Sequence, residues 1–334
     1  MPATSPLAAA AAAPALAFLW LVVFPVVYAT YLARLGFFSR STPASRAAAE
    51  RGASRMLADD RASFTAELVA WLRAVATWRG ECDDPVAWLL LSWEARVTAA
   101  IAYATWRFAP ASVAARLDRM IAPLVARTGT IDEAVLAGKP AQVVILGAGL
   151  DARAHRLRGL DETRWFEVDA PATQRAKRAL VEAATRASPA TFAGSAARDG
   201  RLAYVHVDFS SESFLDKLVE AGFSPAEPRT VFVMEGVTTY LPWEASAETL
   251  RGVSARCAKG TRFVVTFFVT AKGGRNTSFF GAFVKRMGEE HKFSIAPDAD
   301  LAGMLAPLGF RVTDVRAMGK LPQPHNVIVV MEVV

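Results

Sequence analysis

The chain has 334 residues, of which 53% are hydrophobic and 21% charged, and its formal net charge is +6. This length accommodates one large domain with or without an accessory segment, and the composition excludes a disordered chain and a polytopic membrane protein. Basic and acidic residues are interspersed and the two cysteines, Cys82 and Cys257, lie far apart, so we expect no nucleic-acid partner, no metal site and no disulfide framework.

The N-terminal segment is strongly apolar. No charged residue precedes Arg34, and residues 15–32 approach the ~20 apolar positions that a membrane-spanning helix needs. We therefore predict a hydrophobic helix within residues 1–35 that anchors an intracellular protein in a membrane or binds a membrane-protein partner. Arginines follow it on one side only, which places the remaining chain on the cytoplasmic side. A buried helix in a soluble cytoplasmic protein and a targeting segment are the alternatives.

A linker and a helical cap are predicted over residues 36–126. Apolar residues recur at helical spacing over 61–78. A second helix is expected over 83–106, with Pro85 near its first turn, and a third over 111–126. This cap precedes a core domain predicted over residues 127–334.

The core domain alternates short apolar runs with helical segments. This order predicts an α/β fold with a mostly parallel, seven-stranded sheet. Only KLPQPH separates the last two strands, so they should form an antiparallel hairpin, the layout of class I, Rossmann-like methyltransferases. The predicted strands are 142–149, 164–169, 202–209, 230–236, 262–268, 310–315 and 326–334, and the main helices are 171–187, 211–222, 243–258 and 298–308.

A glycine-rich turn follows the first strand in VVILGAGLDARAHRL. Gly147 and Gly149 permit a sharp turn and a close ligand approach. Ala152 completes a G-x-G-x-x-A pattern, so spacing alone does not separate a dinucleotide turn from one that binds S-adenosylmethionine (SAM). Asp151 inside the turn would repel a pyrophosphate but attract the ammonium group of a methionine moiety. The turn therefore favours SAM over a nicotinamide cofactor.

Polar and aromatic side chains follow the next three strands. Because the carboxyl ends of parallel strands form the ligand-binding edge of an open α/β sheet, these residues predict a nucleoside site there. Acids at the second strand can bind ribose, and the residues after the third can bind adenine. The candidates are Glu167 and Asp169, then Asp208 and Phe209, then Glu235 and Tyr240.

The motifs VVILGAGLDARAHRL, WFEVDAP, VHVDF and VFVMEGVTTYL together resemble the leucine carboxyl methyltransferase-like family of SAM-dependent methyltransferases. The resemblance covers roughly residues 60–334. It implies that Arg116 clamps the SAM carboxylate and that Gly147 and Gly149 line the methionine part. It also implies Asp169 or Glu167 on the ribose, Asp208 and Phe209 on adenine, and Glu235 near the amino acid end.

The expected activity is O-methyl transfer, with a carboxylate on a small molecule or a peptide C-terminus as acceptor. Transfer from a sulfonium is an in-line displacement that depends on alignment and water exclusion. A carboxylate is already ionised at pH 7, so it needs no general base, and we interpret the four histidines as surface or packing residues. Tyr240 and Arg153 are the candidates for orienting the acceptor. The alternative is a non-catalytic subunit of a membrane-associated complex.

Overall fold

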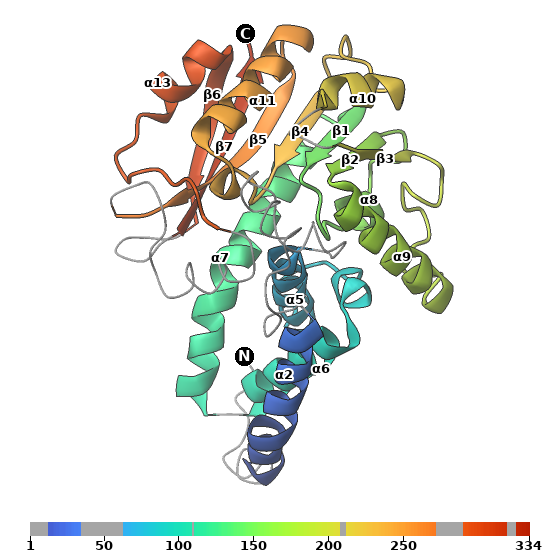
Figure 1. Cartoon of the computed structure of the whole chain (residues 1–334), viewed down its shortest axis with the longest axis vertical. Helices are drawn as coiled ribbons and strands as arrows, with labels where there is room; N and C mark the ends of the chain where they lie inside the picture. Colours follow the sequence, from blue (N-terminus) through green and yellow to red (C-terminus); the bar gives the residue numbers. More distant parts are fainter. Residues whose placement is uncertain (1–12, 35–62, 109, 208–211, 272–289, 319–324) are drawn as a thin grey trace, which may run out of the picture.

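The computed structural model in Figure 1 describes residues 13–34, 63–108, 110–207, 212–271, 290–318 and 325–334. A single seven-stranded sheet, in the order β3-β2-β1-β4-β5-β7-β6, forms its upper part. The first five strands are parallel, and β7 runs antiparallel to both β5 and β6. The strands are β1 (Gln142–Leu146), β2 (Arg164–Asp169), β3 (Leu202–His206), β4 (Thr230–Met234), β5 (Arg262–Val269), β6 (Phe310–Ala317) and β7 (His325–Val333).

All seven predicted strands and the C-terminal hairpin are confirmed, and with them the predicted fold class. Side chains alternate between the two faces of the sheet. Val144 packs in one core with α10, α11 and α13, whereas Val143 packs in another with α7 and α8. These helices are α7 (Ala111–Leu136), α8 (Arg153–Arg156), α9 (Pro171–Ala187), α10 (Phe214–Glu220), α11 (Trp243–Arg256) and α13 (Leu301–Leu305), with short 3₁₀ turns at η3 (Thr238–Tyr240) and η4 (Ala306–Leu308).

The cap consists of α5 (Phe64–Trp78), η2 (Ala87–Leu90), α6 (Trp93–Phe108) and the first half of α7. The single helix predicted over 83–106 is wrong, because the chain is extended at Leu91 between η2 and α6. Ser92 explains the break. Its Oγ accepts a hydrogen bond from the backbone N–H of Ala95 and so caps α6, while its own N–H donates to Glu67.

The long helix α7 joins the cap to the sheet. It continues ten residues past the predicted end at 126, so the expected boundary between residues 126 and 127 falls inside a helix. Ile121 packs in the cap core, whereas Ile131 and Val135 pack against the sheet. Cap and core therefore share one structural element.

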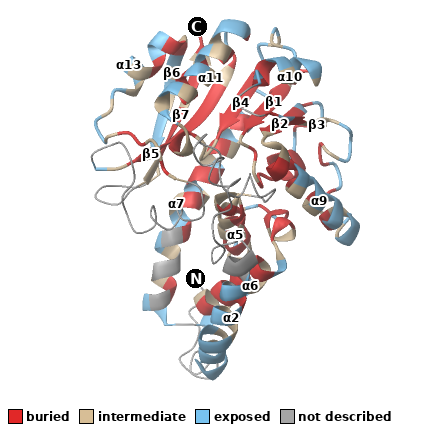
Figure 2. Ribbon diagram, in the orientation of Figure 1, coloured by how far each residue is buried: buried red, intermediate tan, exposed pale blue. Residues whose placement is uncertain are grey.

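Residues 13–34 are helical and pack on α6 through one side. Trp20 Nε1 donates to Thr105 Oγ1 at 2.7 Å, and Val27 is buried. A π-turn, η1 (Leu19–Val23), precedes α2 (Phe24–Arg34), next to Pro25, which has no N–H to donate. Among the described residues no helix is long and apolar enough to cross a membrane, so the predicted membrane-spanning helix has no support. Figure 2 shows that the outer side of this helix is exposed.

Candidate active site

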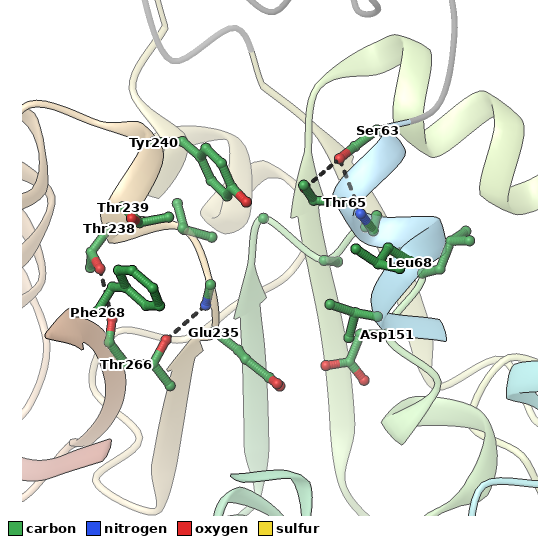
Figure 3. Close-up of a pocket in the computed structure, with 18 of the residues that line it drawn as sticks. Ser63, Thr65, Leu68, Asp151, Glu235, Thr238, Thr239, Tyr240, Thr266 and Phe268 are labelled. Carbon is green, nitrogen blue, oxygen red and sulfur yellow. Dashed lines mark hydrogen bonds between the residues drawn. The ribbon is translucent and has the colours of Figure 1, made fainter. Parts of the chain in front are cut away.

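A cavity of about 500 Å³ lies at the carboxyl ends of β1, β2, β4 and β5, where the N-terminal end of α5 covers it. This volume is within the range of small-molecule sites. Figure 3 shows α5 on one side of the cavity and the segment after β4 on the other. The lining includes Leu68, Val69, Leu72, Arg73, Leu124, Arg127, Gly147, Gly149, Asp151, Asp169, Glu235, Val237, Thr239, Tyr240, Phe268, Glu290, His291, Lys292 and Asn326.

The glycine turn forms the part of the cavity nearest α5. Gly147 has φ of +67°, and a Cβ atom there would lie 2.4 Å from Val237 Cγ2. Gly149 has φ of +44°, and its Cβ would lie 2.9 Å from the Cβ of Ala66 in α5. Both positions therefore require glycine for backbone conformation and for space. The turn brings the chain against the cap and leaves its backbone exposed to a ligand.

Asp169 reaches this cavity and Glu167 does not. Asp169 ends β2, and its carboxylate accepts the backbone N–H of Gly149 at 2.6 Å and that of Ala170 at 2.7 Å. A carboxylate oxygen can accept more than one hydrogen bond, and a ribose hydroxyl needs an acceptor of this kind. Glu167 lies on the same face one pleat deeper, where Lys177 of α9 binds it at 2.6 Å. Burial outweighs the attraction of Lys177 and raises the pKa of Glu167 to about 7.

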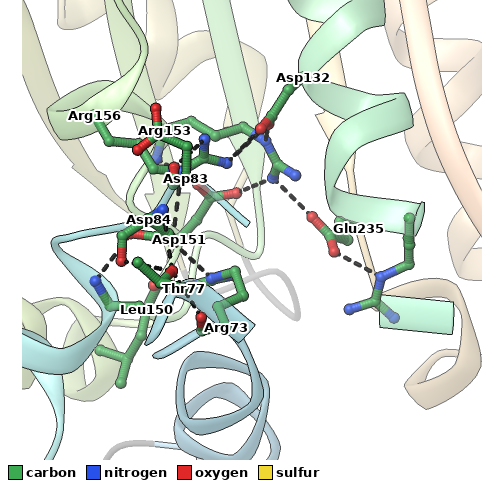
Figure 4. Close-up of polar contacts among 12 residues, drawn as sticks. Arg73, Thr77, Asp83, Asp84, Asp132, Leu150, Asp151, Arg153, Arg156 and Glu235 are labelled. Carbon is green, nitrogen blue, oxygen red and sulfur yellow. Dashed lines mark hydrogen bonds and ion pairs between the residues drawn. The ribbon is translucent and has the colours of Figure 1, made fainter. Parts of the chain in front are cut away.

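Beneath the glycine turn, four arginines and four acids form a buried ionic cluster, which we call the floor network. Arg153 is its centre: it binds Asp151 at 2.5 Å, Glu235 at 2.7 Å and Asp132 of α7 at 2.7 Å. Figure 4 shows these contacts radiating from one guanidinium. The members are Arg73, Asp84, Arg127, Asp132, Asp151, Arg153, Arg156 and Glu235.

The floor network keeps two of its acids, Asp151 and Glu235, ionised. Burial by itself would raise the pKa of Glu235, but Arg153 and Arg127 outweigh it and hold that pKa below its ordinary value. Burial opposes ionisation of Asp151 too, and there Arg153 and Arg73 lower the pKa. Two carboxylates that border the cavity, Asp151 and Glu235, are thus negatively charged at neutral pH.

Arg153, a predicted acceptor residue, lies outside the lining of this cavity. Its side chain is 1% exposed, and its Nε and Nη1 atoms pair with three acids. The sequence placed it correctly after the turn, but α8 carries its side chain below the cavity floor. The acceptor role predicted for Arg153 stays a prediction, and the position of its side chain suits a structural role.

Arg127, which the sequence analysis missed, is the arginine of α7 at the cavity. Its Nε donates to Glu235 at 2.7 Å, and among the described residues it has no other partner. Arg116, which was predicted to clamp the SAM carboxylate, lies three helical turns earlier on α7. Its side chain is not among those that the structure describes. The sequence analysis did not single out Arg127, because the predicted helix ended at residue 126 and left Arg127 outside every predicted element.

The other predicted residues divide between the cavity and the undescribed ranges. Tyr240, in η3, lines the cavity, and Figure 3 shows its hydroxyl directed inward. Asp208 and Phe209, the predicted adenine residues, lie outside the described residues. His291 lines the cavity beside Tyr240 and is 6% exposed, a place that spacing alone could not reveal.

Comparisons with known proteins match this chain to one family. Two relatives are provisionally named SAM-dependent methyltransferases. A Parafrankia sp. (strain EAN1pec) protein is 34% identical over 60% of this chain and 61% of its own length. A Mycolicibacterium paratuberculosis protein is 32% identical over 70% of this chain and 74% of its own length. The chain thus spans about three fifths of the Parafrankia protein and 56% of a Saccharopolyspora erythraea relative.

Solved structures give a weaker likeness. Magnesium protoporphyrin IX methyltransferase from Synechocystis PCC 6803, with bound SAH, has a TM-score of 0.40 at 12% identity over 64% of this chain and 85% of its own. The pyocyanin biosynthetic protein PhzM has a TM-score of 0.41 at 14% identity, over 70% of this chain and 61% of its own. The sequence match is decisive: the leucine carboxyl methyltransferase model covers residues 66–254, more than half of the chain, and the chain belongs to that family.

Proposed function

We propose that this protein is a SAM-dependent O-methyltransferase that methylates a carboxylate on a small molecule or a peptide C-terminus. The observation that carries the proposal is the pairing of charges at the glycine turn. Ionised Asp151 and Glu235 line the cavity together with Arg127, which pairs with Glu235, so the cavity presents both signs of charge. That arrangement complements the ammonium and carboxylate of an amino acid, and Asp169 stands nearby for ribose hydroxyls.

When bound, SAM supplies an activated methyl group on sulfur. In this proposal Arg127 holds its carboxylate, Asp151 and Glu235 attract its ammonium, and Gly147 and Gly149 let it approach the backbone. The sheet order places Asp169 and the glycine turn on the β2–β1 side. The acceptor then belongs on the β4–β5 side, beside Tyr240. A carboxylate acceptor is ionised at pH 7, so the site has to position it and exclude water.

Calorimetric titration with SAM and SAH tests the cofactor site. We expect Asp169→Ala to weaken SAM binding by about 10- to 100-fold, because a charged hydrogen bond is lost, and Arg127→Met to act similarly. Asp199→Asn is the matched control, since Asp199 is well exposed and pairs with Arg201 away from the cavity. Wild-type protein that binds neither compound, yet co-purifies in a complex that tolerates loss of these acids, would instead support a non-catalytic subunit.

We also propose that the helix over residues 13–34 binds a membrane surface or a membrane protein on the cytoplasmic side. Its outer side is apolar and open: Phe18 is 59% exposed, Leu21 78% and Val26 63%. A surface helix usually turns polar residues outward, so such a side favours a partner. Sedimentation with anionic lipid vesicles tests this. Leu21→Gln with Val26→Gln should reduce binding, and binding equal to wild type would contradict it.

A further inference from the structure

Three rings gather on the side of the cavity away from the glycine turn. The ring of His291 lies 5.3 Å from that of Tyr240 and 5.6 Å from that of Phe268, edge to face in both cases. All three line the cavity, and Figure 3 shows Tyr240 and Phe268 directed into it. They come from three segments, η3, the end of β5 and the stretch before α13. The fold therefore assembles an aromatic wall there.

The opposite wall is aliphatic. Leu68, Val69 and Leu72 of α5 line the cavity, and Figure 3 places Leu68 across from Tyr240. A flat apolar group between these walls would contact aromatic rings on one side and methyl groups on the other. Apolar walls with a few placed polar groups are typical of a small-molecule site. This shape favours a flat, apolar acceptor body.

The polar groups on the aromatic wall carry no charge at neutral pH. Burial lowers the pKa of His291, so its imidazole is neutral and keeps one N–H group. Tyr240 contributes a phenol hydroxyl. Among the described residues, the charged groups that line the cavity are Glu290 and Lys292, from the same segment as His291, and five at the cofactor end: Arg73, Arg127, Asp151, Asp169 and Glu235.

Uncharged donors suit methyl transfer to a carboxylate. The carboxylate loses negative charge as its oxygen bonds to the methyl carbon. A cation bound to it would therefore stabilise the starting state more than the transition state and would slow the reaction. A hydroxyl and an imidazole N–H orient the carboxylate with a smaller penalty of this kind.

We propose that Tyr240 and His291 bind the carboxylate of a flat, apolar acid and hold it against the SAM methyl group. The inference rests on the proposed O-methyl transfer. One carboxylate oxygen forms a bond to the methyl carbon with its lone pair. The carbon–sulfur bond breaks, and its electron pair goes to sulfur, which becomes a neutral thioether. No proton moves in this step, so neither residue acts as a base.

The test uses the full chain with radiolabelled SAM and three matched classes of acceptor: benzoate and 2-naphthoate, the corresponding aryl-methanols, and short peptides with a free C-terminal leucine. We expect methyl esters of the aromatic acids. Methylation of the alcohols alone, of the peptides alone, or of none of them would overturn the inference. SAM titration separates this failure from that of the proposed function, because absent SAM binding refutes both.

Variants of the two donors then test their role. Tyr240→Phe and His291→Phe keep the rings and should raise the Kd of 2-naphthoate in the presence of SAH about tenfold, the loss of one hydrogen bond. His291→Gln restores an N–H donor without a titrating ring, and should recover most of that loss. SAM affinity should change less than twofold in all three, and their melting temperatures report whether they fold.

Two results would assign the roles differently. If His291→Gln abolishes turnover and wild-type kcat/KM rises with pH through an imidazole pKa, His291 is a base and the inference fails. If Lys292→Met weakens 2-naphthoate binding more than Tyr240→Phe does, a cation holds the carboxylate, which also contradicts it. A kcat/KM that stays flat between about pH 6 and 8 is the expected result.

Discussion

The floor network and the Glu167–Lys177 pair are both buried ionic groups next to the same sheet, and they differ in the number of partners. Glu235 and Asp132 each contact two arginines, and Asp151 accepts both the backbone N–H and the guanidinium of Arg153. Glu167 has one cation, Lys177. The pKa of Glu235 lies below its ordinary value, whereas that of Glu167 rises to about 7. Burial opposes ionisation in both, and the number of cations decides the outcome.

The difference in pKa corresponds to the position of each ionic group relative to the cavity. The floor network borders the cavity, where ionised Asp151 and Glu235 can attract a ligand cation. The Glu167–Lys177 pair packs between β2 and α9, and neither residue lines the cavity. It acts on the cavity only at a distance, because Lys177 helps to lower the pKa of Asp151. The comparison therefore separates a charge arrangement that serves the site from one that serves packing.

The largest expected effect comes from removing the centre of the floor network. Arg153→Met leaves Asp151, Glu235 and Asp132 without their shared cation, and unpaired buried charges typically cost about 3–5 kcal/mol of unfolding free energy. Urea denaturation at pH 7 measures this loss. A loss below 1 kcal/mol would show that the network contributes little to folding.

The next effect is a pH dependence of opposite sign in the two groups. The raised pKa of Glu167 means that its contribution to stability is present below about pH 4.5 and is lost as pH rises toward 7. Over that window it amounts to on the order of 3 kcal/mol. The lowered pKa of Glu235 gives a contribution that is present above its ordinary pKa and lost on acidification. Comparing wild type with Glu167→Gln by denaturation from pH 4.5 to 8 isolates the first slope, and equal slopes would contradict the assignment.

Lys177→Met should cost less than Arg153→Met, about 2 kcal/mol, because Glu167 can take up a proton and avoid an uncompensated charge. Replacing both partners, as Lys177→Met with Glu167→Leu, should recover most of the loss, since no polar atom then lacks a partner. The same denaturation experiment measures both variants. A double variant less stable than the single one would mean that the pair itself stabilises the fold.

The smallest effect is expected at the surface. Arg316 pairs with Glu133 at 2.9 Å and Asp314 at 2.8 Å, but all three side chains are well exposed. Arg316→Met should leave the free energy of unfolding nearly unchanged, because solvent screens exposed ion pairs. It is the matched control for Arg153→Met, because both arginines contact several acids. A larger loss would remove burial as the explanation of the comparison.

The sheet could be predicted from the sequence because its strands are continuous apolar runs with clear breaks. The glycine turn could also be predicted from its motif, and Gly147 and Gly149 line the cavity as expected. Element ends were less predictable. Ser92 starts α6 through a side-chain hydrogen bond, and α7 continues past Arg127 because Ile131 and Val135 pack on the sheet. Both effects depend on contacts that a periodic pattern does not contain.

The position of a residue at the cavity could be predicted when the residue lies near the end of a strand. It could not be predicted when the direction of its side chain depends on a helix. Asp169, Glu235 and Tyr240 line the cavity, and the sequence indicated their position because each lies at or shortly after the end of a strand. The sequence did not indicate that the single turn of α8 directs Arg153 below the cavity. It also did not indicate that His291 lines the cavity, because the segment of His291 lies far along the chain from the strand ends that it meets. For Arg153 and His291, the position relative to the cavity depends on the three-dimensional packing of the chain.

The shared helix α7 has a practical consequence for exchanging acceptor preferences between relatives. Its first half packs in the cap with Ile121, its second half packs on the sheet, and Arg127 and Asp132 lie in the floor network. A graft that ends at residue 126 would join two halves of one helix from different parents and split these ion pairs. A transplanted cap should therefore carry residues 63–136 as one cassette.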